Sequence, residues 1–305
     1  MSSTSNIADL EPLRDLVTRL TISSNALAAL GLFLNQKIAG IQPDPSIQPY
    51  IDEVIDALGM RAILENASAS QLVPVKAEIQ IAAFQLQKVF ATAAEKSGWT
   101  HTDLTILKNA GQVSMFFPHI LKQRIVPRLG GLAEKLDSTD AAFLDIGVGV
   151  GAMSIEMARL WPSLQIVGID IWNPSLTLAL ENVKNAGFEK RIELREQKAE
   201  DLTDENVFDL IWIPSLFIPA SSISQIMNRV HKAMRSNGWI LFAMAKSGTD
   251  PLVSAVVHLR TAQWGGCILS LQQAEKVLTD AGFVDVQTMP SPPNALISIT
   301  VGRRS

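Results

Sequence analysis

The sequence contains a single cysteine, Cys267, among its 305 residues. One cysteine excludes an intramolecular disulfide and any metal site built from several cysteines. No cluster of residues with metal-ligand spacing is evident either, so we expect no bound metal. An excess of positive charge is also missing, because 26 Lys and Arg face 30 Asp and Glu, for a formal net charge of −4. The chain therefore lacks the global basic field that holds nucleic acid non-specifically.

Long hydrophobic runs are scarce as well. The longest, from Ala26 to Leu34, falls far short of the roughly 20 apolar residues that a membrane-spanning helix needs. The first residues carry no basic stretch followed by an apolar core, which is the pattern of a secretory signal. We therefore expect a cytoplasmic protein with no membrane association. Hydrophobic residues make up 47% of the chain and charged residues 18%, a balance that supports a complete core without disulfides or metals.

The first 130 or so residues have a helical rhythm. The clearest predicted helix runs from Pro74 to Lys96, with Pro74 in its first turn and Gly98 just beyond its end. Apolar residues recur along one face of it at steps of four and three: Val75, Ile79, Ala82, Leu86, Val89 and Ala93. Phe84 and Phe90 lie off this stripe, so a second face is also apolar and needs a cover. We expect a homodimer formed through these N-terminal helices.

From residue 141 onwards, short apolar strands alternate with amphipathic helices. The expected strands cover residues 142–147, 165–169, 192–194, 208–213, 238–243, 284–288 and 295–301. The expected helices between them cover residues 153–160, 175–186, 223–234 and 271–281. This alternation predicts an α/β fold with a Rossmann-like, mostly parallel seven-stranded sheet and helices on both faces. We expect an all-helical domain over residues 1–130 and the α/β domain over residues 131–305.

A glycine-rich loop follows the first predicted strand. Residues 145–151 read Asp-Ile-Gly-Val-Gly-Val-Gly, and a helix starts directly after them. Glycines here allow a sharp turn and a close approach of a ligand to the backbone, and the helix N-terminus favours a polar or anionic group. The spacing is G-x-G-x-G after an acid, which differs from the dinucleotide fingerprint G-x-G-x-x-G. Asp170 ends the next strand, where a carboxylate accepts hydrogen bonds from ribose hydroxyls.

These segments together resemble a known family. Residues 145–151, 167–170, 199–202, 208–211, 237–239 and 281–283 have the order and spacing found in class I S-adenosylmethionine-dependent methyltransferases. The resemblance covers roughly residues 140–303 and implies S-adenosylmethionine as the cofactor. In its layout, the N-terminal half is similar to the helical, dimer-forming half of small-molecule O-methyltransferases.

The resemblance also implies which residues hold the cofactor. The acid and glycines of the loop surround its methionine and ribose parts, Asp170 holds the ribose hydroxyls, and Ile171 or Trp172 packs on the adenine. The family's Gly-Asp-Ala is replaced by Gln-Lys-Ala at residues 197–199, which leaves Glu200 or a backbone carbonyl to contact the adenine. The expected cofactor contacts are Ser114, Asp145, Gly147, Gly149, Gly151, Asp170, Ile171, Trp172, Ala199, Glu200 and Pro214.

Methyl transfer depends mostly on alignment of the reacting atoms, and a base is needed only when the acceptor must lose a proton. The histidine that many plant-type O-methyltransferases carry after the fourth strand is missing from residues 213–219. The candidate catalytic residues are His119, Ser215 and His258, for which packing or surface roles remain the alternative. The candidate walls of the substrate pocket are Phe116, Phe117, Phe217 and Trp264, with ordinary core packing as the alternative.

The expected function is methyl transfer to an oxygen, nitrogen or carbon atom of a small, largely apolar metabolite. A nucleic-acid substrate is one alternative, but enzymes that methylate base amino groups carry an Asn/Asp-Pro-Pro-aromatic run, of which only Pro214 is present. A second alternative is a protein that binds the cofactor but serves as an assembly partner or a non-methylating catalyst, since cofactor binding does not prove transfer.

Overall fold

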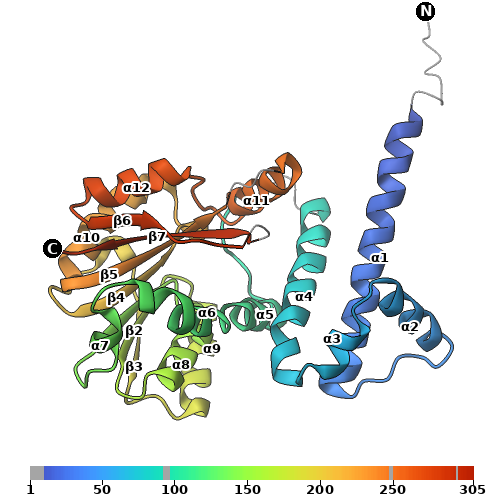
Figure 1. The fold of residues 1–305 in the computed structure, drawn as a ribbon, viewed down its shortest axis with the longest axis horizontal. Helices are drawn as coiled ribbons and strands as arrows, with labels where there is room; N and C mark the ends of the chain where they lie inside the picture. The colour runs from blue at the N-terminus through green and yellow to red at the C-terminus, as the bar shows by residue number, and fades with distance from the viewer. Residues whose placement is uncertain (1–9, 92–96, 247–249, 293–294) are drawn as a thin grey trace, which may run out of the picture. The chain divides into compact units, whose positions relative to one another are not determined.

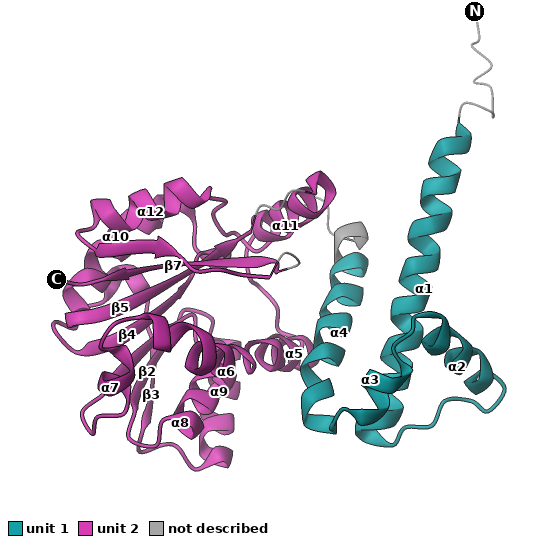
Figure 2. Ribbon diagram, viewed as in Figure 1, with its two compact units in different colours: residues 1–91 teal, residues 92–305 magenta. Residues whose placement is uncertain are grey.

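The structure is a computed structural model that describes residues 10–91, 97–246, 250–292 and 295–305. It divides into two compact units, residues 1–91 and residues 92–305 (Figure 2). The sequence places the boundary near residue 130, whereas α5 (Leu104–Ser114) packs against α8 (Ala152–Leu160) within the larger unit. The helical segment before residue 130 therefore groups with the sheet.

The smaller unit is helical throughout its described part. It contains α1 (Glu11–Ala39), α2 (Gln48–Ala57), α3 (Arg61–Asn66) and α4 (Ala69–Ala91). Its buried core consists of Phe33, Leu34, Ile51, Ile55, Leu64, Leu72 and Ile79. The core draws on each of these helices, so the unit has an apolar centre of its own.

Helix α4 begins earlier than the sequence predicts, at Ala69, so the prediction of Pro74 in the first turn is wrong. The backbone N–H of Ser68 donates to Oε1 of Gln71 at 2.9 Å, and the N–H of Gln71 donates to the Ser68 hydroxyl at 3.4 Å. This reciprocal capping starts the helix ahead of the proline. The predicted end near Lys96, together with the side chains of Val89 and Phe90, lies outside the described residues.

Helix α1 exposes a long apolar face. Leu13, Leu16, Val17 and Leu20 lie on one helix face, because each is three or four residues from two of the others, and each is exposed. By length and composition alone, α1 is the helix within the described ranges that is long and apolar enough to cross a membrane, with a mean hydropathy of 1.4 over 18 residues. The uninterrupted run counted in the sequence understates this property, because isolated polar residues break the run without making the helix polar.

The larger unit contains the sheet. Its strands are β1 (Ala142–Ile146), β2 (Gln165–Asp170), β3 (Ile192–Glu196), β4 (Phe208–Pro214), β5 (Met234–Ala245), β6 (Val284–Thr288) and β7 (Ile297–Arg303). Its further helical segments are α6 (Phe117–Ile120), η2 (Leu121–Ile125), η3 (Val126–Arg128), α7 (Leu132–Leu136), α9 (Asn173–Ala186), η4 (Ala199–Asp201), η5 (Ser215–Phe217), α10 (Ala220–Ala233), α11 (Pro251–Gln263) and α12 (Leu271–Asp280).

The sheet confirms the predicted fold class. Its strand order is β3-β2-β1-β4-β5-β7-β6, and β7 runs antiparallel to both of its neighbours. One apolar core joins the sheet to α10 and α12, and a second joins it to α7 and α8 on the other face (Figure 1). The sheet is thus Rossmann-like, mostly parallel and seven-stranded, with helices on both faces and a helical region before it.

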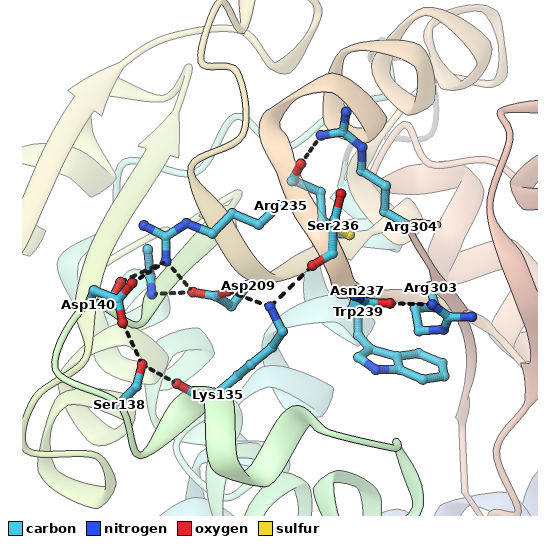
Figure 3. A network of polar contacts seen from close by, with 12 residues as sticks. Lys135, Ser138, Asp140, Asp209, Arg235, Ser236, Asn237, Trp239, Arg303 and Arg304 are labelled. Carbon is cyan, nitrogen blue, oxygen red and sulfur yellow. Dashed lines mark hydrogen bonds and ion pairs between the residues drawn. The ribbon is translucent and has the colours of Figure 1, made fainter.

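A polar network ties the elements together at the amino ends of the parallel strands (Figure 3). The Asp209 carboxylate, buried at the start of β4, accepts from the Ala142 N–H at 3.0 Å. It also accepts from Lys135 Nζ at 3.3 Å and from Arg235 at 2.8 Å. These contacts join α7, β1, β4 and β5, which leaves the carboxyl ends of the strands as the edge where ligands bind in open α/β sheets.

Candidate functional site

The glycine-rich loop connects β1 to α8 at the carboxyl edge of the sheet. Gly147, Gly149 and Gly151 have φ angles of 74°, 56° and 77°, a left-handed backbone that favours glycine. The N–H groups of Gly147 and Val148 donate to the carbonyl of Ile169 at 2.8 and 3.0 Å, which holds the loop against β2. A Cβ built on Gly149 would meet mostly open space, since its nearest neighbour is the Gly147 carbonyl oxygen at 4.0 Å. The loop therefore leaves its backbone open to a ligand.

Asp145 lies at the base of this loop and is 1% exposed. Its Oδ2 accepts a hydrogen bond from the Ser154 hydroxyl at 2.7 Å, while its Oδ1 has no partner among the described residues. Burial raises the pKa of this carboxyl to about 7, an effect that the Ser154 hydrogen bond opposes. A buried oxygen without a partner is costly, so it marks a place where a ligand donor fits.

Asp170 ends β2 beside the loop. Its Oδ2 accepts from the Gly149 N–H and its Oδ1 from the Trp172 N–H, both at 2.8 Å. Burial raises the pKa of this carboxyl, and the two backbone hydrogen bonds partly offset that rise. The carboxylate is thus fixed in orientation next to the glycine loop and keeps lone pairs for ligand hydroxyls.

The remaining predicted cofactor residues lie on segments around the same edge. Ala199 is buried in η4, whereas Ile171 is 65% exposed after β2. Pro214 lies against the loop, since a Cβ on Gly147 would be 3.5 Å from its Cγ. Glu200 follows in η4, and its carbonyl accepts from Gln225 at 3.4 Å. On α5, the Ser114 hydroxyl donates to the Gly111 carbonyl at 2.7 Å, which occupies its proton.

An aromatic wall stands at the carboxyl end of β4. Phe217 and Trp264 stack with their ring centroids 5.0 Å apart and their planes 17° apart. Ser215 precedes Phe217 by two residues; it is fully buried, and its hydroxyl has no partner among the described residues. The loop after Trp264 is held to this place, because the Cys267 N–H donates to the Ser215 carbonyl at 3.1 Å. Two predicted pocket residues and one predicted catalytic residue therefore share this wall.

The other predicted site residues lie on α6, directly before it, or on α11. Phe117 packs on Trp212, with 4.4 Å between ring centroids, and both side chains are partly buried against the core. Nε2 of His119 lies 2.8 Å from Oε1 of Glu156 on α8. The side chain of Phe116 is 39% exposed. His258 is half-buried on α11.

Two residues of this region were not predicted as site residues. Trp99 has its ring centroid 5.3 Å from that of Phe217 and 5.9 Å from that of Trp264. His101 is buried, and its ring lies 4.6 Å from that of Trp99. In the sequence, Trp99 and His101 stand just before Asp103, the N-cap of α5. The N-cap indicates where the helix starts, but nothing in the local sequence indicates the contacts of Trp99 with distant rings.

A hollow of about 440 Å³ lies at the opposite, amino edge of the sheet. It is lined by Gly130, Trp239, Asp285, Val286, Gln287 and Arg303. Arg303 already donates to the side chains of Asp285 at 2.6 Å and Asn237 at 2.5 Å. The side-chain oxygens of Asp145 and Ser215 that have no partner in the described part of the chain lie instead at the carboxyl edge, which is the candidate functional site.

Known proteins resemble the larger unit in sequence. Residues 137–283 match the sequence profile of a family described as "Methyltransferase domain". The release factor glutamine methyltransferase of Geobacter sulfurreducens is 28% identical over 173 residues, which cover 53% of this chain and 58% of that protein. The match thus spans little more than half the length of that curated relative.

Solved structures share the fold over the whole chain. An O-methyltransferase family protein from Burkholderia thailandensis has a TM-score of 0.60 and 14% identity, and the match covers 99% of both chains. Human N-acetylserotonin methyltransferase in complex with S-adenosylmethionine has a TM-score of 0.61 and 17% identity over 100% of both chains. The N-terminal helical region is included in both matches, so it belongs to the shared architecture.

Proposed function

Because residues 137–283 match a family model described as a methyltransferase domain, we propose that this protein is an S-adenosylmethionine-dependent methyltransferase that transfers the methyl group to a small, largely apolar metabolite. The observation that carries the proposal is the pair of buried acids around the open glycine loop. Oδ1 of Asp145 has no partner among the residues that the structure describes, and the Asp170 carboxylate is fixed by two backbone N–H groups. This donor and acceptor set suits a ligand with a cationic amino group and vicinal hydroxyls.

When bound, S-adenosylmethionine would supply a methyl group on a sulfonium sulfur: the acceptor would form a bond to the methyl carbon as the methyl C–S bond breaks, and the neutral thioether S-adenosylhomocysteine would leave. Asp145 would hold the amino group of the methionine part, which favours the ionised carboxylate and lowers its pKa from about 7. Asp170 would accept from the ribose hydroxyls. Ile171 and Trp172 would cover the adenine on one side, with Ala199 and Glu200 on the other.

The aromatic wall would orient the acceptor. Phe217 and Trp264 offer apolar surface, and the Ser215 hydroxyl is a polar group without another partner in the described structure. A hydrogen bond from Ser215 to the acceptor heteroatom would hold that atom in line with the methyl group, which is the main requirement of the reaction. His258 stays a candidate base, whereas a catalytic His119 would first have to leave Glu156.

The acceptor atom is left open among oxygen, nitrogen and carbon. One curated relative is, by its name, a release factor glutamine methyltransferase. We favour a small molecule here because aromatic rings form the wall and the chain carries a net charge of −4. That charge opposes a nucleic-acid substrate.

We also propose that a second copy of this chain covers the exposed apolar face of α1. Leu13, Leu16, Val17 and Leu20 form a stripe that an isolated chain leaves in water. Light scattering after gel filtration should give twice the chain mass of 33.1 kDa, and the double change Leu16→Glu, Leu20→Glu should halve it. A wild-type monomer that floats with phosphatidylcholine vesicles would show that a membrane covers the face instead.

Turnover tests the proposed reaction directly. The protein is incubated with S-adenosylmethionine and a small-molecule fraction of a bacterial extract, and S-adenosylhomocysteine is measured by mass spectrometry. We expect release of S-adenosylhomocysteine above the extract-free background. Asp170→Asn should abolish this release. Asp280→Asn should keep it, because Asp280 is an exposed acid paired with Lys276 on α12. Tight cofactor binding without any turnover across extracts would favour a non-methylating role.

A further inference from the structure

Residues 97–101 form a short segment, called the strap here, that touches both sides of the site. Trp99 is its centre and is half-buried. On one side its ring meets Phe217 and Trp264 edge-on, at interplanar angles of 83° and 81°. The strap therefore packs against the aromatic wall that would bind the acceptor.

On its other side, Trp99 belongs to the cofactor half of the site. It packs against the apolar cluster of Leu107, Val150 and Leu178, and so does Trp172, which follows Asp170 by two residues. The indole Nε1 of Trp172 donates to the carbonyl of His101, the last residue of the strap, at 2.7 Å. The strap is thus attached to the residue expected beside the adenine.

The strap is also fixed next to the loop that carries Trp264. The Gly98 N–H donates to the Gln263 carbonyl at 2.8 Å, and a Cβ on Gly265 would lie 3.2 Å from the Gly98 Cα. Trp264 itself packs in a separate cluster, with Leu216, Ala245 and Val257. The aromatic wall and the adenine side are therefore distinct packing groups, and Trp99 contacts both.

We propose that Trp99 is a positioning residue that couples the acceptor wall to the cofactor side. The proposal rests on the proposed function, because it assigns the two walls to acceptor and cofactor. A ligand that orders Trp172 also orders the strap, and the strap then fixes Phe217 and Trp264. Packed side chains with few alternative arrangements transmit such a bias, and the coupling is reciprocal between the two ligands.

The coupling has a consequence that can be measured without the acceptor. Removing the Trp264 ring frees one side of Trp99 and loosens the strap, so the affinity for cofactor falls although Trp264 lies in the other packing group. We expect Trp264→Leu to weaken S-adenosylhomocysteine binding at least about fivefold. In a Trp99→Leu background the same change has no further effect, because the connection is already broken.

The experiment is a double-mutant cycle by calorimetric titration of the full chain with S-adenosylhomocysteine. It uses wild type, Trp264→Leu, Trp99→Leu and the double variant, each checked for folding by circular dichroism. Trp99→Phe keeps an edge-on ring and should restore most of the affinity. Phe188→Leu is the matched control, since Phe188 is a half-buried ring under Arg191, as Trp264 is under Arg260.

The outcomes separate the two proposals. A wild type that does not bind S-adenosylhomocysteine overturns the proposed function and the coupling with it. If the wild type binds S-adenosylhomocysteine, two results overturn the coupling alone. Either the losses of affinity in Trp264→Leu and Trp99→Leu add up in the double variant, or Trp264→Leu has no effect on the affinity. An equal loss in Phe188→Leu also overturns it, because the effect would then reflect general destabilisation.

Discussion

The buried carboxyl of Asp145 predicts a specific pH dependence of stability. Its pKa is about 7 in the folded protein, against 3.8 for an unperturbed aspartate, because burial disfavours the charged form. The folded state therefore binds a proton more tightly than the unfolded state. The stabilisation from this group is complete below pH 4 and is lost as the pH rises through 7.

The magnitude follows from the shift. Between the two pKa values the free energy of unfolding falls by at most about 1.4 kcal/mol per pH unit. From pH 5 to pH 7, Asp145 alone should lower it by about 2 to 3 kcal/mol. Asp145→Asn has no proton to lose, so the difference between wild type and variant isolates this contribution from all other titrating groups.

Urea unfolding of both proteins at pH 5, 6, 7 and 8 is the assay. We expect the wild type to lose stability relative to Asp145→Asn up to about pH 7 and to level off above it. Added S-adenosylmethionine should reduce this loss, since its ammonium group stabilises the ionised carboxylate. A stability difference that stays flat with pH would refute the reasoning, because the carboxyl would then be charged throughout the range.

Other predictions concern the surroundings of the site. Gly111→Ala should lower the free energy of unfolding by about 1 to 3 kcal/mol and weaken cofactor binding, because the added Cβ would lie 2.3 Å from Val150 Cγ2 in the glycine loop. Thermal unfolding measures the first effect and titration with the cofactor measures the second. Asp209→Asn should cost about 2 to 3 kcal/mol in urea unfolding and leave cofactor affinity unchanged, since it weakens the pairing with Arg235 at the far edge of the sheet. Ser215→Ala should keep or slightly raise the free energy of unfolding, because it removes a buried hydroxyl that has no partner among the described residues. The same change should lower turnover about tenfold or more, and unchanged turnover would exclude Ser215 from the site.

The sheet and the glycine loop were predictable from sequence because each depends on local pattern. Buried parallel strands appear as short apolar runs, and the left-handed turns of the loop require glycine at Gly147, Gly149 and Gly151. The seven-stranded sheet and the resemblance to methyltransferases were confirmed. The sequence predicts a start of α4 at Pro74 because proline is typical of a first turn, whereas the capping pattern of Ser68 and Gln71 starts the helix earlier.

The acceptor side depends on contacts between distant segments, which no local pattern reveals. Trp99 meets Trp264 across more than half of the chain, and α11, which leads to Trp264, was not predicted as a helix. Its N-cap, Asp250, accepts from the N–H groups of Leu252 and Val253, a signal that sequence reasoning could have used. The packing of Phe117 on Trp212 is likewise a contact between distant segments, which the sequence alone does not reveal.

The central claim is that the two acids and the glycine loop bind S-adenosylmethionine. Calorimetric titration of the purified protein with S-adenosylmethionine, and separately with NADH, tests it most directly. We expect micromolar binding of S-adenosylmethionine, none of NADH, and loss of binding in Asp170→Ala. Binding of NADH, or no binding of S-adenosylmethionine at millimolar concentration by the folded protein, would contradict the claim.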